Sequence, residues 1–589
     1  MKSLKHMTRC LLKQTLTCSI GLIFAVGVQA QSQVVISFST SNSTALSMGF
    51  AGFTTELLGT GVEYGDTNMQ HYAAMLSPGW LLFPAGETGD AFDWRTGSTD
   101  TNWVNKIQTT GNPTIATLTQ NTCLSLLGKG GAWLTNFASL ADNLGGAKII
   151  VCINGFTDTN TSIGAEAAYA VSNHVPVAVW ELCNEPYNLK GATNFFASGT
   201  DYANKMLPFR NAIKAADSNA VVAVFYSDPA KPDTAWDNDL DNYTNKYWDA
   251  VVFHYYPRLG TNDSFQDQMA LDNGNLFSNS TAYVSNNFIK YNHNNVTCLL
   301  TELNPNLGDS SGSTQYPPTS TLYGGIFASE YVMRLSAMSQ MSFAGSYQLV
   351  DGSGVDTTNL YWNAVTKAAT NNVTTNTIGL PFGYFLSAQG SAEAVAYWAI
   401  NRSVAVYSTS VGANCPVVPM DTNGVNTMPA IYAQAYQGGN GKRYVLLTNK
   451  GSNAVPVQIT QDGEVLTNQF LETFVTGSDP NVVNSNPPTN NVVIQTGTAT
   501  NSVTIPEYSV VRLEWIVSTV PIPTLALTDA SGEQYLYWPG TTNVIYNVQG
   551  AANLPGSWTT LGRVANTVTN FGFTNWNSGP QEFFRIAVP

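Results

Sequence analysis

The sequence predicts an α/β protein: a (β/α)8 TIM barrel with a C-terminal β-sandwich and a small additional C-terminal β-rich domain. Between residues 45 and 390, eight short apolar runs alternate with longer segments of helical periodicity. After residue 390 the helical periodicity fades and short alternating runs follow one another. A proline-containing stretch at 520–523 then precedes a final segment of about 70 residues, a usual size for a small domain.

Each barrel strand is predicted from an apolar run of four to eight residues that is bounded by turn-forming residues. Runs of this kind are typical of parallel strands that helices cover on the outside. The eight candidate strands are 48–54, 79–84, 148–154, 175–182, 220–226, 250–256, 296–302 and 343–350. Apolar residues recurring at three and four positions predict helices at 123–144, 201–216, 280–291 and 323–338.

The β-sandwich is predicted over residues 391–516, and the final β-rich module over 517–589. The candidate strands of the sandwich are 395–399, 404–408, 443–448, 455–460, 492–496 and 510–515. A further apolar run at 34–38 lies in the segment 31–44, ahead of the first barrel strand. We expect it to pair into the sandwich and so to join the barrel and the sandwich.

The first 30 residues have the features of a secretory signal peptide. Lys2, Lys5, Arg9 and Lys13 precede an apolar stretch, and small residues end it at Val28-Gln29-Ala30. The sequence therefore predicts cleavage near Ala30 and a secreted, periplasmic or cell-surface protein. No later stretch reaches about 18 uninterrupted apolar residues, so no membrane span is expected.

Composition and charge narrow the class of partner. The net charge is −14, and loss of the four basic residues of the leader would make it more negative. This balance argues against nucleic acid and anionic membranes as partners. The five cysteines outside the leader are an odd number at wide spacing, which predicts at most one disulfide. Cys152, Cys183 and Cys298 lie beside no histidine or cysteine at a metal-ligand spacing, so they are expected to be small buried hydrophobic residues and not metal ligands.

Two glutamates stand where barrel enzymes place catalytic groups. The apolar run 177–182 ends in Cys183-Asn184-Glu185-Pro186, after the fourth candidate strand. The seventh candidate strand closes on Glu302. Catalytic residues of such barrels lie at the C-terminal ends of strands. Hydrolysis of a glycoside with retention needs two carboxyls about 5–5.5 Å apart, and the mouth of a barrel can bring these two together.

Asn184-Glu185-Pro186 after strand four, with Glu302 after strand seven, resembles clan A of the retaining glycoside hydrolases. The resemblance implies that Glu185 is the acid/base, Glu302 the nucleophile and Asn184 a donor to the sugar 2-hydroxyl. It also implies that a tyrosine after strand six holds the nucleophile ionised. Tyr256 is the candidate, with His254 as its neighbour on the same face.

Other residues near the carboxylates are less specific. Trp180, on strand four, is a further candidate for substrate binding, whereas Glu181 is expected to make an internal ion pair or hydrogen bond. Loops after the candidate strands carry four more tryptophans, and one or two of these are expected to line a sugar subsite. They are Trp94, Trp236, Trp248 and Trp362.

The segment 83–97 resembles a loop of α-L-arabinofuranosidases and of the related β-glucuronidase and heparanase-like families. The run Ile505-Pro506-Glu507-Tyr508-Ser509-Val510-Val511-Arg512-Leu513 resembles their closing sandwich strand. The pattern departs at Leu82, where the clan has an arginine that supports the nucleophile, and at Ala85, where it has glycine. Arg95 is a candidate substitute from a different point of the loop.

Three functions stay open from the sequence. The leading one is a secreted retaining glycoside hydrolase that acts on a polysaccharide or oligosaccharide without a cofactor. A transglycosylase would use the same carboxylates, because the covalent intermediate is common to both. A non-catalytic carbohydrate-binding or surface protein on this fold is the third. Which sugar and linkage is cleaved, endo or exo action and the oligomeric state are left open.

Overall fold

A computed structural model gives the fold of the chain. It describes residues 33–55, 64–65, 67–84, 86–110, 132–189, 195–229, 232–256, 284–285, 296–304, 321–349, 365–367, 384–419, 425, 427–482, 484, 492–500 and 502–516, and in the last segment 526–530, 533–539, 545–551, 559–565, 570–575 and 583–587. The expected leader, Trp362 and most of the helix predicted at 280–291 lie outside these residues.

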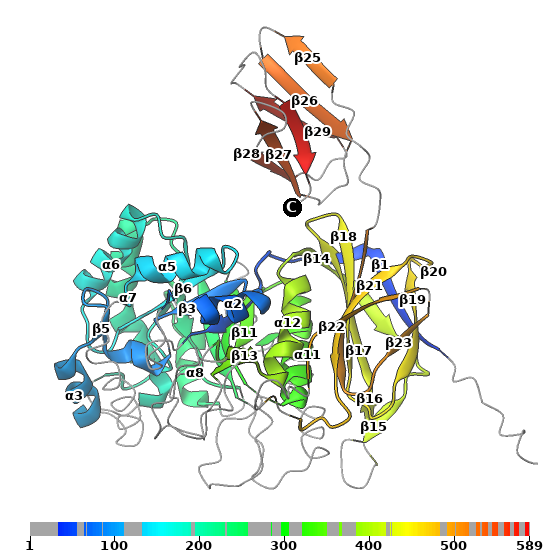
Figure 1. Cartoon of the computed structure of the whole chain (residues 1–589). Helices are drawn as coiled ribbons and strands as arrows, with labels where there is room; N and C mark the ends of the chain where they lie inside the picture. The colour runs from blue at the N-terminus through cyan, green and yellow to red at the C-terminus, as the bar shows by residue number, and fades with distance from the viewer. Residues whose placement is uncertain are drawn as a thin grey trace, which may run out of the picture.

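Eight parallel strands close into a barrel, which confirms the predicted fold class. All eight apolar runs chosen from the sequence become its strands (Figure 1). In chain order they are β2 (Ala51–Thr54), β3 (Trp80–Phe83), β6 (Lys148–Ile153), β7 (Val177–Leu182), β8 (Val222–Phe225), β9 (Ala250–Tyr255), β10 (Thr297–Leu303) and β11 (Met341–Ser346).

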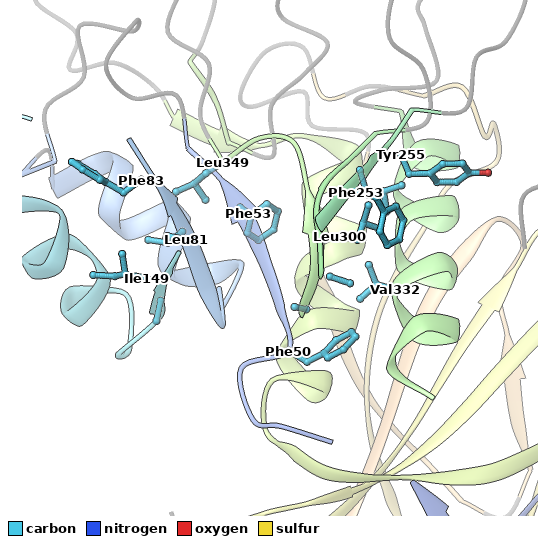
Figure 2. Packing of buried hydrophobic residues seen from close by; sticks show 14 of the residues in the cluster. Phe50, Phe53, Leu81, Phe83, Ile149, Phe253, Tyr255, Leu300, Val332 and Leu349 are labelled. Carbon is cyan, nitrogen blue, oxygen red and sulfur yellow. The ribbon is translucent and has the colours of Figure 1, made fainter. Parts of the chain in front are cut away.

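Alternate residues of each strand face the inside and the outside of the barrel, because successive side chains of a strand point to opposite faces. The inner cluster includes Leu82 and Val252, and both are fully buried. Their neighbours Leu81 and Phe253 belong to the larger outer cluster. Figure 2 shows Phe253 on the side of its strand that faces α11 (Leu322–Ser336), where Val332 lies. The strands are therefore buried on both faces, which explains their continuous apolar runs.

Helices surround the barrel, and two of the four predicted helices match closely. Segment 201–216 forms α7 and segment 323–338 forms α11, each with a serine or threonine N-cap, Ser198 or Thr321. The described part of 123–144 forms α5. In chain order, the described helices that precede α11 are α2 (Thr67–Met75), α3 (Thr101–Thr110), α5 (Leu134–Asn143), α6 (Asn160–Ser172), α7 (Gly199–Ala216) and α8 (Thr234–Asp241), with the 3₁₀ turns η2 (Glu87–Ala91) and η3 (Pro186–Leu189).

One predicted strand is wrong: residues 395–399 lie inside α12 (Ala388–Ile400). Ser387 caps this helix by accepting a hydrogen bond from the Gly390 N–H. Almost every residue of α12 is buried, because it packs between the barrel and the following sheet. A helix that is buried on all sides lacks the exposed polar stripe that reveals helical periodicity. It also spans residue 391, where the sequence pattern placed the start of the sandwich.

The second part of the chain forms a ten-stranded mixed sheet that curls around its own apolar cluster. The predicted early strand, β1, lies within this sheet, antiparallel to β14 and parallel to β19. The strands are β1 (Val34–Ala45), β14 (Ser403–Val411), β17 (Ile431–Gly438), β18 (Lys442–Asn449), β19 (Val455–Gln461), β20 (Glu464–Val465), β21 (Phe470–Thr476), β22 (Gln495–Ala499), β23 (Val503–Ile505) and β24 (Ser509–Ile516).

The last segment forms two three-stranded antiparallel sheets, one of β25 (Ala526–Ala530), β26 (Glu533–Pro539) and β29 (Asn570–Asn575) and one of β27 (Ile545–Ala551), β28 (Thr559–Ala565) and β30 (Phe583–Ala587). Three small pairs complete the strands: β4 (Phe92–Asp93) with β5 (Ser98–Thr99), β12 (Val365–Lys367) with β13 (Tyr384–Leu386), and β15 (Val417–Pro419) with β16 (Thr427–Pro429). Across the described residues, no helix is both long and apolar enough to cross a membrane.

Candidate active site

The two predicted glutamates lie at the C-terminal ends of barrel strands. Glu185 follows β7, the fourth barrel strand, and Glu302 lies near the end of β10, the seventh. Between them in the barrel order stand β8 and β9, and β9 carries His254 as its next-to-last residue. This is the end of a TIM barrel where catalytic residues lie.

Local departures from regular strand geometry direct both glutamates into the barrel mouth. After β7, Cys183 and Glu185 have positive φ angles of 72° and 40°, so the chain turns sharply there. In β10, Leu300 pairs with Phe253 and Glu302 pairs with His254, which leaves Thr301 as an extra residue in a bulge. A bulge of this kind re-aims a side chain beside a site. In a regular strand Thr301 and Glu302 would point to opposite faces; the bulge removes this constraint.

His254 joins the two carboxylates. Its Nδ1 lies 2.8 Å from Glu185 Oε1 and 3.2 Å from Glu302 Oε2. The imidazole is fully buried, whereas 16% of the Glu185 side chain is exposed. Glu185 is therefore the member of the group that faces the solvent at the mouth, with His254 and Glu302 below it.

Each carboxylate has further partners. The Tyr256 hydroxyl donates a hydrogen bond to Glu302 Oε2, which is the contact that the clan A resemblance implies. The Asn188 amide donates to Glu185 Oε2. Glu302 Oε1 and Asn184 Oδ1 are buried and have no hydrogen-bond partner among the described residues. The described residues therefore leave the hydrogen-bonding capacity of these two oxygens unused.

The group titrates as a coupled set. Burial raises the pKa of Glu302 to about 7, with the like charge of Glu185 adding to the effect and His254 opposing it. Burial also acts to raise the pKa of Glu185, but hydrogen bonds from His254, Tyr187 and Asn188 hold it below its ordinary value. Burial alone would lower the pKa of His254, yet Glu302 and Glu185 raise it to about 9. A single imidazolium thus faces both carboxyls in neutral solution.

The structure brings Glu185, Glu302, Asn184, His254 and Tyr256 together, but not Trp180. Trp180 belongs to the cluster outside the barrel, because it alternates with Val179 and Glu181, which share the inner face. Its predicted role in binding substrate is therefore corrected to packing. Trp236 and Trp248 are buried in the same outer cluster, and Trp94 packs partly against it.

Tyr187 and Asn188, which both hydrogen-bond Glu185, were not predicted from the sequence. Their position in the turn after Glu185 is a usable signal, since a residue three positions along a 3₁₀ turn can reach back. Arg95 does not replace the missing arginine. Its guanidinium contacts Asp93 and Ser162 and stays 44% exposed. Leu82, at the arginine position, packs inside the barrel.

Glu185, His254 and Glu302 also form a possible ligand set for a metal ion, with one donor atom from each within 4.8 Å of the others. Imidazole with two carboxylates suits a transition-metal ion such as Zn²⁺. Such an ion would use the same carboxylate oxygens that glycosidic chemistry requires. A metal in this position and a sugar in this position therefore compete.

Comparison with solved structures shows the same architecture in glycoside hydrolases. An α-L-arabinofuranosidase from Thermotoga maritima is 17% identical with a TM-score of 0.59, and the match covers 82% of this chain and 99% of that one. A family 51 α-L-arabinofuranosidase from Bifidobacterium longum is 16% identical with a TM-score of 0.60, covering 82% and 99%. A 4-O-α-L-rhamnosyl-β-D-glucuronidase from Fusarium oxysporum is 14% identical with a TM-score of 0.50, covering 81% and 100%.

These likenesses confirm the resemblance at the level of the fold: an eight-stranded parallel barrel with a β-rich domain, as in clan A glycoside hydrolases. Comparison with protein families finds no match, and comparison with curated proteins finds none either. At such identities the fold alone is shared, so the chemistry of this chain has to be argued from its own residues.

Proposed function

We propose that this protein is a secreted retaining glycoside hydrolase that cleaves a polysaccharide or oligosaccharide through two glutamates. The observation that carries the proposal is the Glu185–His254–Glu302 group at the ends of the fourth, sixth and seventh barrel strands. One donor atom from each lies within 4.8 Å of the others. Inverting enzymes need carboxyls about 6.5–9.5 Å apart to admit a water between them, so the short separation favours retention.

In the first step, Glu302 attacks the anomeric carbon and the bond to the leaving oxygen breaks. Glu302 Oε1 is suited to attack because it has no hydrogen-bond partner among the described residues, while Tyr256 donates to the other oxygen. The leaving oxygen takes a proton from Glu185, the more exposed carboxyl. The His254 Nδ1–H lies 2.8 Å from Glu185 Oε1 and is the adjacent donor that can pass this carboxyl its proton.

In the second step, Glu185 accepts a proton from water while the water oxygen attacks the anomeric carbon of the glycosyl ester. The ester bond to Glu302 breaks, and the sugar leaves with its original configuration. An acceptor hydroxyl in place of water would give transfer through the same intermediate. Asn184 lies beside Glu185 with a free Oδ1, in a place to contact a sugar hydroxyl.

The activities of the similar proteins, an α-L-arabinofuranosidase and a 4-O-α-L-rhamnosyl-β-D-glucuronidase, suggest the first substrates to try. The panel is the aryl α-L-arabinofuranoside, β-D-glucuronide, β-D-xyloside, β-D-glucoside and β-D-galactoside, followed by polysaccharides. The test compares the mature protein with Glu302→Gln. Glu166→Gln is the matched control, because Glu166 is another buried glutamate but lies on α6.

We expect turnover of at least one substrate, a loss of more than a thousandfold in Glu302→Gln, and little change in Glu166→Gln. Azide then assigns the roles. With azide, Glu185→Ala should form a glycosyl azide of retained configuration, because azide replaces water in the second step. Glu302→Ala should form a glycosyl azide of inverted configuration, because azide replaces the missing nucleophile. EDTA should leave the rate unchanged. Sugar binding by both wild type and Glu302→Gln without turnover in either would instead establish the binding-only alternative.

A further inference from the structure

The ends of β10 and β11 are held together by a side chain where their regular pairing stops. The ladder between the two strands ends at Leu300 and Ala344. Beyond it, the Tyr347 N–H donates to the Leu303 carbonyl at 3.0 Å, and the Asn304 side-chain amide donates to the Tyr347 carbonyl. Asn304 is fully buried and comes directly after β10. Its amide thus takes the place of backbone pairing at the barrel mouth.

Two polar residues of α12, Gln389 and Glu393, orient Asn304 from outside the barrel, and they are called the α12 pair below. Gln389 Nε2 donates to Asn304 Oδ1 at 3.3 Å and to Glu393 Oε1 at 2.9 Å. The hydroxyl of Ser346, the last residue of β11, donates to the same Oε1 at 2.8 Å. The α12 pair stands four positions apart, so both side chains lie on the helix face that meets the strand ends.

This network is costly for stability. Glu393 is fully buried, and its Oε2 has no hydrogen-bond partner among the described residues. The rest of α12 is rich in alanine. Apolar residues in place of a buried charge are often neutral or stabilising, because a buried carboxyl loses its hydration. A buried polar network does, however, fix one arrangement of the groups that it joins. We therefore expect it to serve placement and not stability.

The group that the network places is Tyr347, which contacts Tyr256. The two rings meet edge to face, with centroids 6.2 Å apart and planes at 74°. Tyr256 comes directly after β9 and donates its hydroxyl hydrogen to Glu302 Oε2. A hydrogen bond weakens steeply when its angle is poor, so this one depends on the tilt of the Tyr256 ring. A path of contacts therefore runs from α12 through Asn304 to Glu302.

We propose that Asn304 is a positioning residue for the reaction. Asn304, oriented by the α12 pair, holds Tyr347 in place. The Tyr347 ring in turn keeps the Tyr256 hydroxyl directed at Glu302. The importance of that hydrogen bond rests on the proposed function, in which Glu302 is the nucleophile. Asn304 acts on the nucleophile only through the two tyrosines, so its effect should vanish when the Tyr256 hydroxyl is absent.

A double-mutant cycle tests this dependence. Asn304→Ala should lower kcat about tenfold and leave KM nearly unchanged, because the misplaced hydroxyl matters in the chemical step and not in binding. In the Tyr256→Phe background the same substitution should cost almost nothing further, since residues that act through one contact are not additive. Asn449→Ala is the matched control: Asn449 is also fully buried and donates to a backbone carbonyl, that of Pro506, but lies on β18. Equal losses of kcat in both backgrounds would overturn the proposal.

A second readout does not depend on turnover. In protein that contains 3-fluorotyrosine, ¹⁹F NMR follows the Tyr256 ring, and Tyr256→Phe identifies its signal among the 27 tyrosines. Asn304→Ala should shift this signal, whereas Asn449→Ala should not. An unchanged signal in folded Asn304→Ala would overturn the proposal. A shifted signal in a protein that cleaves no glycoside supports the role of Asn304 while the hydrolase proposal fails.

Glu393 supplies variants outside the mouth. Glu393→Gln keeps an oxygen that can accept from Gln389 and Ser346, so its Tyr256 signal should match that of the wild type. Glu393→Leu removes the acceptor and should shift the signal, although its stability is expected to change little. Glu393→Leu therefore decides if Asn304→Ala does not fold, and an unchanged Tyr256 signal in this variant would overturn the proposal equally.

Discussion

At the scale of single residues, the contacts of Glu302 could be predicted from the sequence only in part. The resemblance to clan A paired Tyr256 with Glu302 at the sequence level, and the hydrogen bond between them joins the ends of neighbouring strands. The bridging geometry of His254 could not be predicted, because it depends on the bulge at Thr301. Trp180 was misplaced for a related reason: in a strand buried on both faces, composition does not show which side chains point inward.

Replacing Tyr256 with phenylalanine should lower kcat/KM about ten- to a hundredfold. The lost hydrogen bond is one to an ionised carboxylate, which contributes about 1.5–3 kcal/mol. Tyr256 acts to lower the pKa of Glu302, which burial holds at about 7. Glu302 must be ionised to attack, so activity is lost as the pH falls through this pKa, and Tyr256→Phe should move that acid limb to higher pH.

The measurement is the pH profile of kcat/KM for both proteins, between about pH 5 and 10. In the wild type the acid limb should follow Glu302 and the alkaline limb His254. Tyr72→Phe, on α2, is a suitable control for a partly buried tyrosine away from the mouth. An acid limb that stays in place in Tyr256→Phe would contradict the role of Tyr256.

Among the elements, strands β2 and β11 meet where the barrel closes, and glycines make this contact possible. A Cβ on Gly345 would lie 2.0 Å from the Gly52 carbonyl oxygen and 2.6 Å from the Trp80 ring. Trp80 fills the inside of the barrel at this level and is fully buried. The sequence shows these glycines inside apolar runs but not their partners, because the contact joins the first, second and eighth barrel strands.

Gly345→Ala should destabilise the protein by about 3 kcal/mol or more, since overpacking of a tight core typically costs about 1–3 kcal/mol and the nearest atom here is backbone. Urea unfolding followed by tryptophan fluorescence measures the change. Gly65→Ala is the matched control, because a Cβ there has no atom within 4 Å. Equal stability of both variants would show that the β2–β11 contact is looser than described.

Across the whole molecule, the barrel and the curled sheet are joined by a buried ionic group on α11. Glu330 accepts from Arg334 at 2.8 Å, from Lys450 at 2.7 Å and from the Thr448 hydroxyl at 2.8 Å. Burial opposes the ionised form of Glu330, but Lys450 and Arg334 lower its pKa to about 2. The sequence could assign the barrel and the sheet separately, but not this junction, because Glu330 and Lys450 lie 120 positions apart in the chain.

Glu330→Gln should cost about 3–5 kcal/mol, because it leaves the buried Lys450 without its counter-charge. The folded-state pKa lies below the ordinary value of 4.5, so this stabilisation is present above about pH 4.5 and is lost as the pH falls towards 2. Thermal unfolding at pH 7 and pH 3 measures both effects. The difference between wild type and variant should shrink at pH 3. Glu464→Gln, on the exposed strand β20, is the control.

The position of β1 has a consequence for how the protein is made. Thr460 on β19 hydrogen-bonds Ser37 on β1, 423 positions earlier in the chain. A chain that emerges from its N-terminus therefore carries an unpaired apolar strand throughout synthesis of the barrel. An unpaired strand edge invites association with other chains. A fragment of residues 31–400 would lack β14 and β19, the two strands that pair with β1. A soluble barrel fragment should therefore start after residue 45.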